Sequence, residues 1–85
     1  MSENEYESIE YRVSLIGYEE EDRPFNDKIC GTFEDEETAL WFERNYPFSK
    51  IDGASTTVVQ VEKVGIYENG QNEEVVDILE EREVE

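Results

Sequence analysis

The sequence predicts a small α+β fold, in which one antiparallel sheet of about four strands carries a single helix in the order β-β-α-β-β. Residues 9–18 and 56–67 alternate between apolar and polar side chains, a pattern typical of half-buried strands. Between them, residues 35–46 place apolar side chains three and four positions apart, as a helix with one buried face does. The chain has 85 residues, which is short for more than one core, so we expect a single domain over residues 1–85.

The first hairpin is expected to join residues 9–18 to a second strand at residues 28–33. The stretch between them is rich in acidic residues and contains Pro24 and Asn26, both of which favour a loop. The hairpin is therefore expected to have a long acidic connection. Two sets of side chains should each share one face of their strand: Ile9, Tyr11, Val13 and Leu15 in the first, and Ile29, Gly31 and Phe33 in the second.

The helix is expected to begin after Asp35 and to end before Pro47. The Asp35 carboxylate can accept hydrogen bonds from the unpaired amides of the first turn, and Glu36 and Glu37 lie where the helix dipole favours negative charge. Proline cannot continue the helix, because it lacks an amide hydrogen. We expect Ala39, Phe42 and Tyr46 to face the sheet and to be buried with Tyr11, Val13, Leu15, Val59 and Val61.

The second hairpin is expected to join residues 56–67 to a last strand at residues 73–79. Asn69-Gly70 lies between them and favours a type I′ turn, because both central residues of that turn need positive φ. The apolar alternation changes parity along the first of these strands, which predicts a bulge or twist near Lys63. Thr57, Val59 and Val61 share one face, whereas Val64 and Ile66 fall on the other.

The carboxyl-terminal segment leaves one alternative open. Asn72 could instead cap a helix that buries Val75, Val76 and Leu79. The two ends of the chain, residues 1–8 and 80–85, are acidic, and we expect them to be solvated and frayed.

The net charge is the feature of this sequence that bears most directly on function. The chain contains 24 Asp and Glu against 7 Lys and Arg and no histidine, so its formal charge is −17. A compact chain of this length spans roughly 30 Å, which gives one net charge per 1.8 Å or so, close to the roughly 1.7 Å of duplex DNA. Such a charge repels nucleic acid and anionic lipid, and it favours a basic protein surface as the partner.

The sequence offers little for catalysis or metal binding. Without histidine the chain lacks the commonest general base, and Cys30 has no histidine to activate it, so we expect Cys30 to be a packed side chain. The chain contains no cysteine and histidine set for zinc, no calcium-binding loop and no glycine-rich phosphate loop. We therefore expect no enzymatic activity, no cofactor and no metal site.

We expect the protein to be cytoplasmic. Its first residues lack the basic and apolar regions of a signal peptide, and no apolar run approaches the roughly 18 residues of a membrane span. The single cysteine, Cys30, fits a reducing compartment.

The candidate partner-binding residues lie in the acidic connection of the first hairpin and at the helix start. The acids of the connection have no helix dipole to stabilise them, and they surround Phe25, an apolar side chain that could anchor a partner. The candidate set comprises Glu19, Glu20, Glu21, Asp22, Phe25, Asp27, Glu34, Glu36 and Glu37.

Two functions are compatible with these features. The first is an inhibitor, of the type encoded by phages and other mobile elements, that mimics the charge of nucleic acid and occupies a basic DNA- or RNA-binding surface of a partner protein. The alternative is an acidic adaptor or accessory subunit that recognises its partner through exposed apolar residues. In that case the acidity serves solubility or a salty cytoplasm.

Overall fold

The computed structural model describes residues 6–20, 23–68 and 72–85, and it confirms the predicted β-β-α-β-β order. The elements are β1 (Tyr6–Tyr18), β2 (Pro24–Phe33), α1 (Glu36–Asn45), β3 (Thr56–Tyr67) and β4 (Glu73–Glu83). The strands form one antiparallel sheet in the spatial order β2-β1-β3-β4. β1 and β3 are therefore the central strands, and β2 and β4 are the edges.

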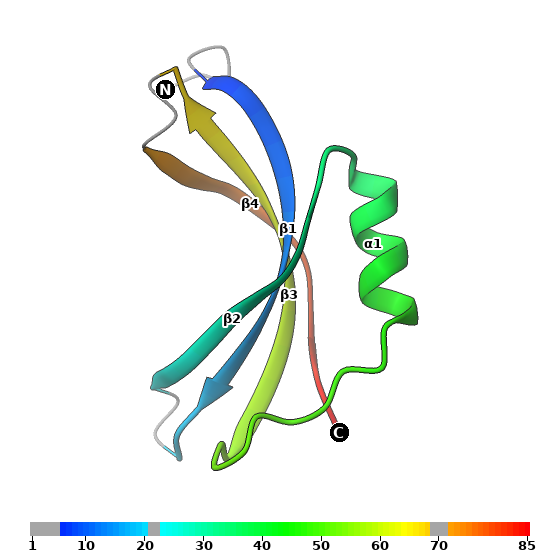
Figure 1. Cartoon of the computed structure of the whole chain (residues 1–85). Coiled ribbons are helices and arrows are strands. Elements are labelled where there is room, and N and C mark those ends of the chain that lie inside the picture. The colour runs from blue at the N-terminus through cyan, green and yellow to red at the C-terminus, as the bar shows by residue number, and fades with distance from the viewer. Residues whose placement is uncertain (1–5, 21–22, 69–71) are drawn as a thin grey trace.

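The sheet is strongly curved, and α1 lies on its convex side (Figure 1). We call this side the helix face and the concave side the open face, because no described element covers the concave side (Figure 1). The molecule measures 39 × 27 × 17 Å along its principal axes, whereas α1, with 10 residues, is only about 15 Å long. Among the described residues, no helix has the length and apolar character needed to cross a bilayer.

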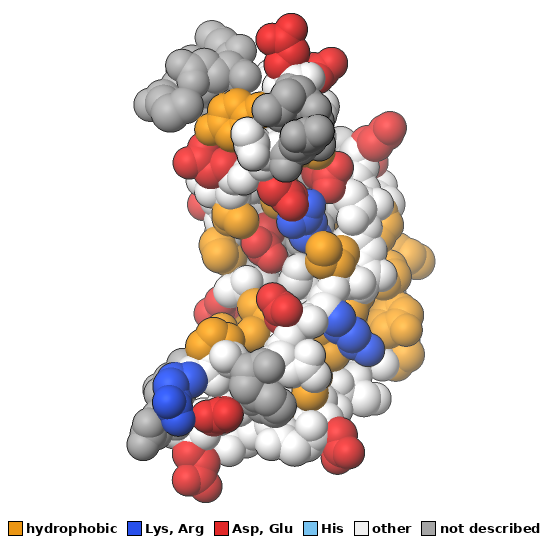
Figure 2. All heavy atoms as spheres, turned by 60° about the vertical axis from the view of Figure 1, so that its left-hand side comes forward, with side chains coloured by type: hydrophobic (Ala, Val, Ile, Leu, Met, Phe, Trp, Pro, Cys, Tyr) orange, Lys and Arg blue, Asp and Glu red, His pale blue; other side chains and the backbone are white. Residues whose placement is uncertain are grey.

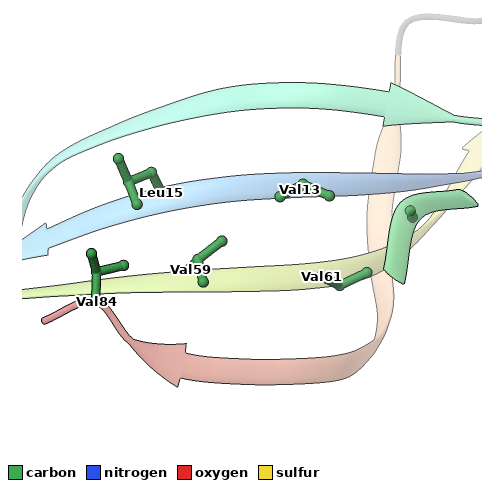
Figure 3. Close-up of a cluster of buried hydrophobic side chains, with 6 residues drawn as sticks. Val13, Leu15, Val59, Val61 and Val84 are labelled. Atoms are coloured by element: carbon green, nitrogen blue, oxygen red, sulfur yellow. The ribbon is translucent and has the colours of Figure 1, made fainter. Parts of the chain in front are cut away.

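The core lies between α1 and the helix face. Its buried side chains are Val13, Leu15, Ala39, Val59, Val61 and Val84 (Figure 3). Tyr11 and Phe42 pack against this cluster and are half-buried. The prediction that Tyr46 is buried was wrong, since this residue is 50% exposed. Tyr46 lies just beyond the last turn of α1, where its ring packs on Phe48, with the ring centroids 4.8 Å apart, instead of on the sheet.

The two ends of α1 follow the prediction. Asp35 is the N-cap, and its carboxylate accepts hydrogen bonds from the Thr38 amide at 2.9 Å and the Thr38 hydroxyl at 2.8 Å. These bonds favour the ionised form and hold the pKa of Asp35 below its ordinary value. At the other end, the Tyr46 amide donates to the Phe42 carbonyl at 2.9 Å, and the helix stops before Pro47.

Strand β2 is longer than predicted. It begins at Pro24 instead of Lys28, so the acidic connection from β1 is shorter than expected. A proline is tolerated at the first residue of an edge strand, because its missing amide hydrogen is not needed there. The prediction that residues 24–27 form part of the loop was therefore wrong.

A bulge in β2 also separates residues that were expected to share a face. Val13 of β1 pairs with Gly31, but the next residue, Ser14, pairs with Ile29, so Cys30 is the extra residue. Gly31 consequently lies on the helix face, whereas Ile29 lies on the open face.

The irregularity expected near Lys63 of β3 occurs in the neighbouring strand instead. Val76 and Leu79 of β4 have no partner on β3, and each forms a bulge. Strand β3 pairs with β1 without a register shift at this point, and Val64 is buried on the open face. The parity change in the sequence therefore reflects a strand that buries residues on both of its faces.

The carboxyl-terminal segment is a strand, which excludes the helical alternative, and it extends further than expected. β1 includes residues 6–8 and β4 includes residues 80–83, although these stretches were expected to fray. Val84 is buried, and its amide donates to the Thr57 carbonyl at 2.8 Å, which holds the end of the chain on the sheet. Residues 1–5 and the Asn69-Gly70 turn lie outside the described residues.

Candidate functional site

The candidate partner-binding carboxylates that the structure describes are all exposed. Glu19 and Glu20 lie in the β1–β2 connection, Asp27 lies in β2, and Glu34, Glu36 and Glu37 surround the start of α1. Glu21, Asp22 and the side chain of Phe25 lie outside the described part of the structure.

The structure does not bring these carboxylates into one site. The β1–β2 connection and the start of α1 lie at opposite ends of β2, whose 10 residues span roughly 33 Å. Glu19 is held by Arg23, with Arg23 Nη2 lying 3.2 Å from Glu19 Oε2. Asp27 lies on the open face, opposite Ile16 of β1. The candidate set therefore borders β2 at both ends instead of forming one acidic patch.

Strand β4 carries a further acidic group that was not among the candidate residues. This group, which we call the acidic edge, comprises Glu73, Glu74, Asp77, Glu80, Glu81 and Glu83. Within the strand only Arg82 offsets these charges. Because β4 is an edge strand, one side of its backbone has no neighbouring strand in the described structure, and its charge opposes pairing with a second copy. The sequence shows the charge, but the exposure of the strand depends on the strand order.

Several carboxylates of the acidic edge are held by groups of the same molecule. The contacts are the ion pairs Arg12–Glu73 and Arg44–Glu80 and the hydrogen bond from Gln60 to Glu81. Arg12 lies on the open face of β1 and forms a second ion pair with Glu10, in which Arg12 Nη2 lies 3.2 Å from Glu10 Oε2. The two ion pairs of the acidic edge reduce the charge that it presents to a partner, and the hydrogen bond restrains Glu81.

Glu74 is bound by two tyrosines from neighbouring strands. Tyr6 and Tyr67 both donate a hydrogen bond from their hydroxyl groups to Glu74 Oε2. The bond from Tyr67 is 3.1 Å long, and the centroids of the two tyrosine rings lie 5.0 Å apart. The hydrogen bonds from Tyr6 and Tyr67 lower the pKa of Glu74, and the bond to Glu74 raises the pKa of Tyr6. An ionised carboxylate thus joins the start of β4 to the start of β1 and the end of β3.

Glu43 of α1 is a buried carboxylate that sequence reasoning missed. Its side chain is 1% exposed, and its Oε1 accepts a hydrogen bond from Arg82 Nε. Arg82 Nη2 also donates to the Glu43 carbonyl at 3.1 Å, and the guanidinium lies 5.8 Å from the centroid of the Phe48 ring. Glu43 follows Ala39 by four positions and shares its buried face, which is the signal that could have identified it. The pair joins α1 to β4 and so has a structural role.

The open face combines apolar and charged side chains without a continuous apolar patch (Figure 2). Ile29 on β2 and Val75 and Ile78 on β4 are 57%, 47% and 46% exposed. They lie at opposite edges of the sheet, and the row across the sheet from Ile29 continues through Ser14, Gln60 and Glu81. Polar residues therefore separate the exposed apolar side chains of the two edges.

Cys30 is the only thiol of the chain, and its surroundings do not activate it. Burial raises the pKa of Cys30, and the charge of Lys28 opposes this shift only in part. Within the described residues, no three acidic or thiol side chains are grouped so that they could hold a metal ion.

Comparisons with known proteins give no functional lead. No protein-family model matches the chain, and no curated protein and no solved structure matches it. Function is therefore inferred from geometry and charge.

Proposed function

We propose that this protein is a non-enzymatic binding protein that mimics the charge of nucleic acid and occupies a basic, nucleic-acid-binding surface of a partner protein. The density of charge carries this proposal. Dividing the longest axis of 39 Å by the 17 net negative charges gives one charge per 2.3 Å, against roughly 1.7 Å for duplex DNA. The molecule is longer than a compact chain of its size, so its charge density is lower than the sequence alone suggested, yet it stays comparable to that of DNA.

The pairing of the arginines supports the proposal. All four, Arg12, Arg23, Arg44 and Arg82, form ion pairs with glutamates. Their charges are offset within the molecule and do not form a basic patch that could hold phosphates. The remaining carboxylates make the surface charge negative, and they attract a basic partner over a distance of about 10 Å at 0.1 M salt.

A second function is favoured by one specific observation, the exposure of Ile29, Val75 and Ile78 on the open face. Apolar side chains that are this exposed on an uncovered sheet could bind a partner chiefly through apolar contact. The protein would then be an adaptor, and its acidity would serve solubility.

Salt and DNA competition distinguish the two functions. The immobilised protein is incubated with cell lysate, and bound proteins are eluted either with rising salt or with duplex DNA. Mimicry predicts that a basic, DNA-binding protein is released between roughly 50 and 200 mM salt and is displaced by DNA, because both ligands use the same cationic surface. Partner binding that resists both treatments would contradict mimicry and favour the adaptor.

A further inference from the structure

A cleft of about 370 Å³ lies on the helix face, between β2 and the segment that follows α1. Leu15 of β1 lies on its inner side, and the half-buried Phe48 and Ile51 line it together with Tyr46. The cleft lies where α1 no longer covers the helix face, and the chain beyond α1 runs back from the helix to the start of β3 (Figure 1). Its walls combine apolar and aromatic side chains with polar and charged ones, as small-molecule sites do where a few polar groups orient the ligand.

Two cations line this cleft, Lys28 of β2 and Lys50 of the segment after α1. Neither side chain forms an ion pair or a hydrogen bond within the described part of the chain, whereas the four arginines are all paired with glutamates. Lysines without a carboxylate partner are unexpected in a chain whose net charge is −17. Both of them line this cleft, together with its apolar side chains.

The charges at the cleft restrict the ligand further. Asp52 also lines the cleft, so the charges of Lys28, Lys50 and Asp52 add up to +1. Asn26 and Ser49 add neutral hydrogen-bonding groups. A ligand with a single negative charge matches this lining, whereas a doubly charged phosphate would meet Asp52 and the negative field of the whole molecule.

We propose that this cleft binds a small organic acid, in which an apolar ring or chain carries one carboxylate. The apolar part would lie against Leu15 and Phe48, and the carboxylate would lie between Lys28 and Lys50. The volume is at the lower end of the roughly 300 to 1,000 Å³ of small-molecule sites, so a single-ring acid fits better than a peptide. This site is independent of the acidic surface, and either proposal can fail without the other.

The test is a titration of the ¹⁵N-labelled protein, followed by amide chemical shifts, with benzoate as the probe. Benzamide is the uncharged control, and inorganic phosphate is the control for an anion without an apolar part. We expect saturable shifts at Lys28, Cys30 and Ile51 with benzoate, and binding at least about fivefold weaker for either control, because each lacks one of the two interactions.

Variants assign the effect to the lysines. Lys28→Gln with Lys50→Gln should weaken benzoate binding by about fivefold or more, since two exposed ion pairs are lost. Lys63→Gln is a matched control, because Lys63 lies outside the cleft lining, and it should leave the affinity unchanged. The proposal is overturned if benzoate causes no saturable shifts at the cleft, if benzamide binds equally well, or if the double variant binds benzoate as tightly as the parent.

Discussion

The two edges of the sheet, β2 and β4, differ sharply in charge although they occupy equivalent positions. β4 carries six carboxylates and one arginine in 11 residues, whereas β2 carries only Asp27 and Lys28 in 10 residues. Both edges have bulges, at Cys30 in β2 and at Val76 and Leu79 in β4, which hinder pairing with another strand. The difference shows that total charge does not predict which surface is available to a partner.

The contacts of the carboxylates sharpen this difference. Around β2, no hydrogen bond or ion pair of the Glu20, Asp27 or Glu34 side chain occurs within the described part of the chain. On β4, Glu73, Glu74, Glu80 and Glu81 are all held by residues of the same molecule. Glu20, Asp27 and Glu34 are therefore available to a partner, whereas much of the charge on β4 stabilises the fold.

The largest effect is expected from removing the cation that joins β4 to α1. Arg82→Ala leaves the Glu43 carboxylate, which is 1% exposed, without its partner. Loss of one partner of a buried pair costs about 3 to 5 kcal/mol, and we expect the lower end because the Arg82 side chain is 42% exposed. Chemical denaturation measures this loss of unfolding free energy.

The control for this prediction replaces both members of the pair. In the variant with Glu43→Leu and Arg82→Leu no unpaired charge is left, so it should be more stable than Arg82→Ala. A single variant as stable as the parent would show that β4 is held by other contacts.

A smaller effect is expected on partner association, and it compares the two edges directly. One variant carries Glu20→Gln, Asp27→Asn and Glu34→Gln near β2, and the matched variant carries Glu73→Gln, Asp77→Asn and Glu81→Gln on β4. Each removes three charges, but those near β2 are not held by other side chains. We expect the first variant to slow association with the captured partner by about tenfold at low salt without changing the thermal midpoint.

The β4 variant should behave in the opposite way. It should slow association less and should lower the thermal midpoint, because Glu73 no longer neutralises the half-buried Arg12. Association rates are measured by surface-immobilised binding and midpoints by circular dichroism. If the β4 variant associates more slowly than the β2 variant, the partner contacts β4, and the acids near β2 are not the main binding surface.

The smallest effect is expected from the hydrogen bond between Tyr6 and Glu74, and it depends on pH. Since the folded pKa of Glu74 is lowered, the bond stabilises the fold above the unfolded pKa of about 4.3 and is lost as pH falls through the folded value. Since the pKa of Tyr6 is raised, the contribution persists below about pH 10 and declines above it. Tyr6→Phe should therefore be less stable than the parent at neutral pH, and chemical denaturation should show that this difference shrinks as the pH falls through the folded pKa of Glu74.

A second variant tests the same bond without removing the hydroxyl group. A Cβ atom at Gly65 would lie 2.5 Å from the Tyr6 ring, so Gly65→Ala must displace the ring. It should lower stability more than Tyr6→Phe does, and its stability should depend less on pH in acid than that of the parent. A difference between Tyr6→Phe and the parent that is the same at every pH would exclude Glu74 as the cause.

The fold could be predicted from local sequence patterns, whereas the positions of the bulges could not. Alternation in residues 56–67 and the cap at Asp35 depend only on neighbours along the chain, and both are confirmed. The bulge at Cys30 depends on how β2 pairs with β1 in a twisted sheet. It places Ile29 on the face opposite to that of Gly31, and no local sequence pattern predicts this.

The candidate site was predictable in its chemistry and not in its geometry. The acidic character follows from composition, but the separation of Glu20 from Glu34 follows from the length of β2. The partner of the buried Glu43 is Arg82, which lies 39 positions further along the chain. Contacts between such distant residues are set by the sheet topology, and periodicity does not report them.

The central pairing of β1 with β3 has a consequence for how the chain folds. β1 with β2 and β3 with β4 are hairpins of adjacent strands, whereas the seam between them joins residues as distant as Tyr6 and Tyr67. Closing that seam costs more chain entropy than forming either hairpin, so we expect it to limit the folding rate. A chain cut between α1 and β3 would give two halves that each expose one unpaired central strand, and their reassembly would be a bimolecular reaction whose rate rises with concentration.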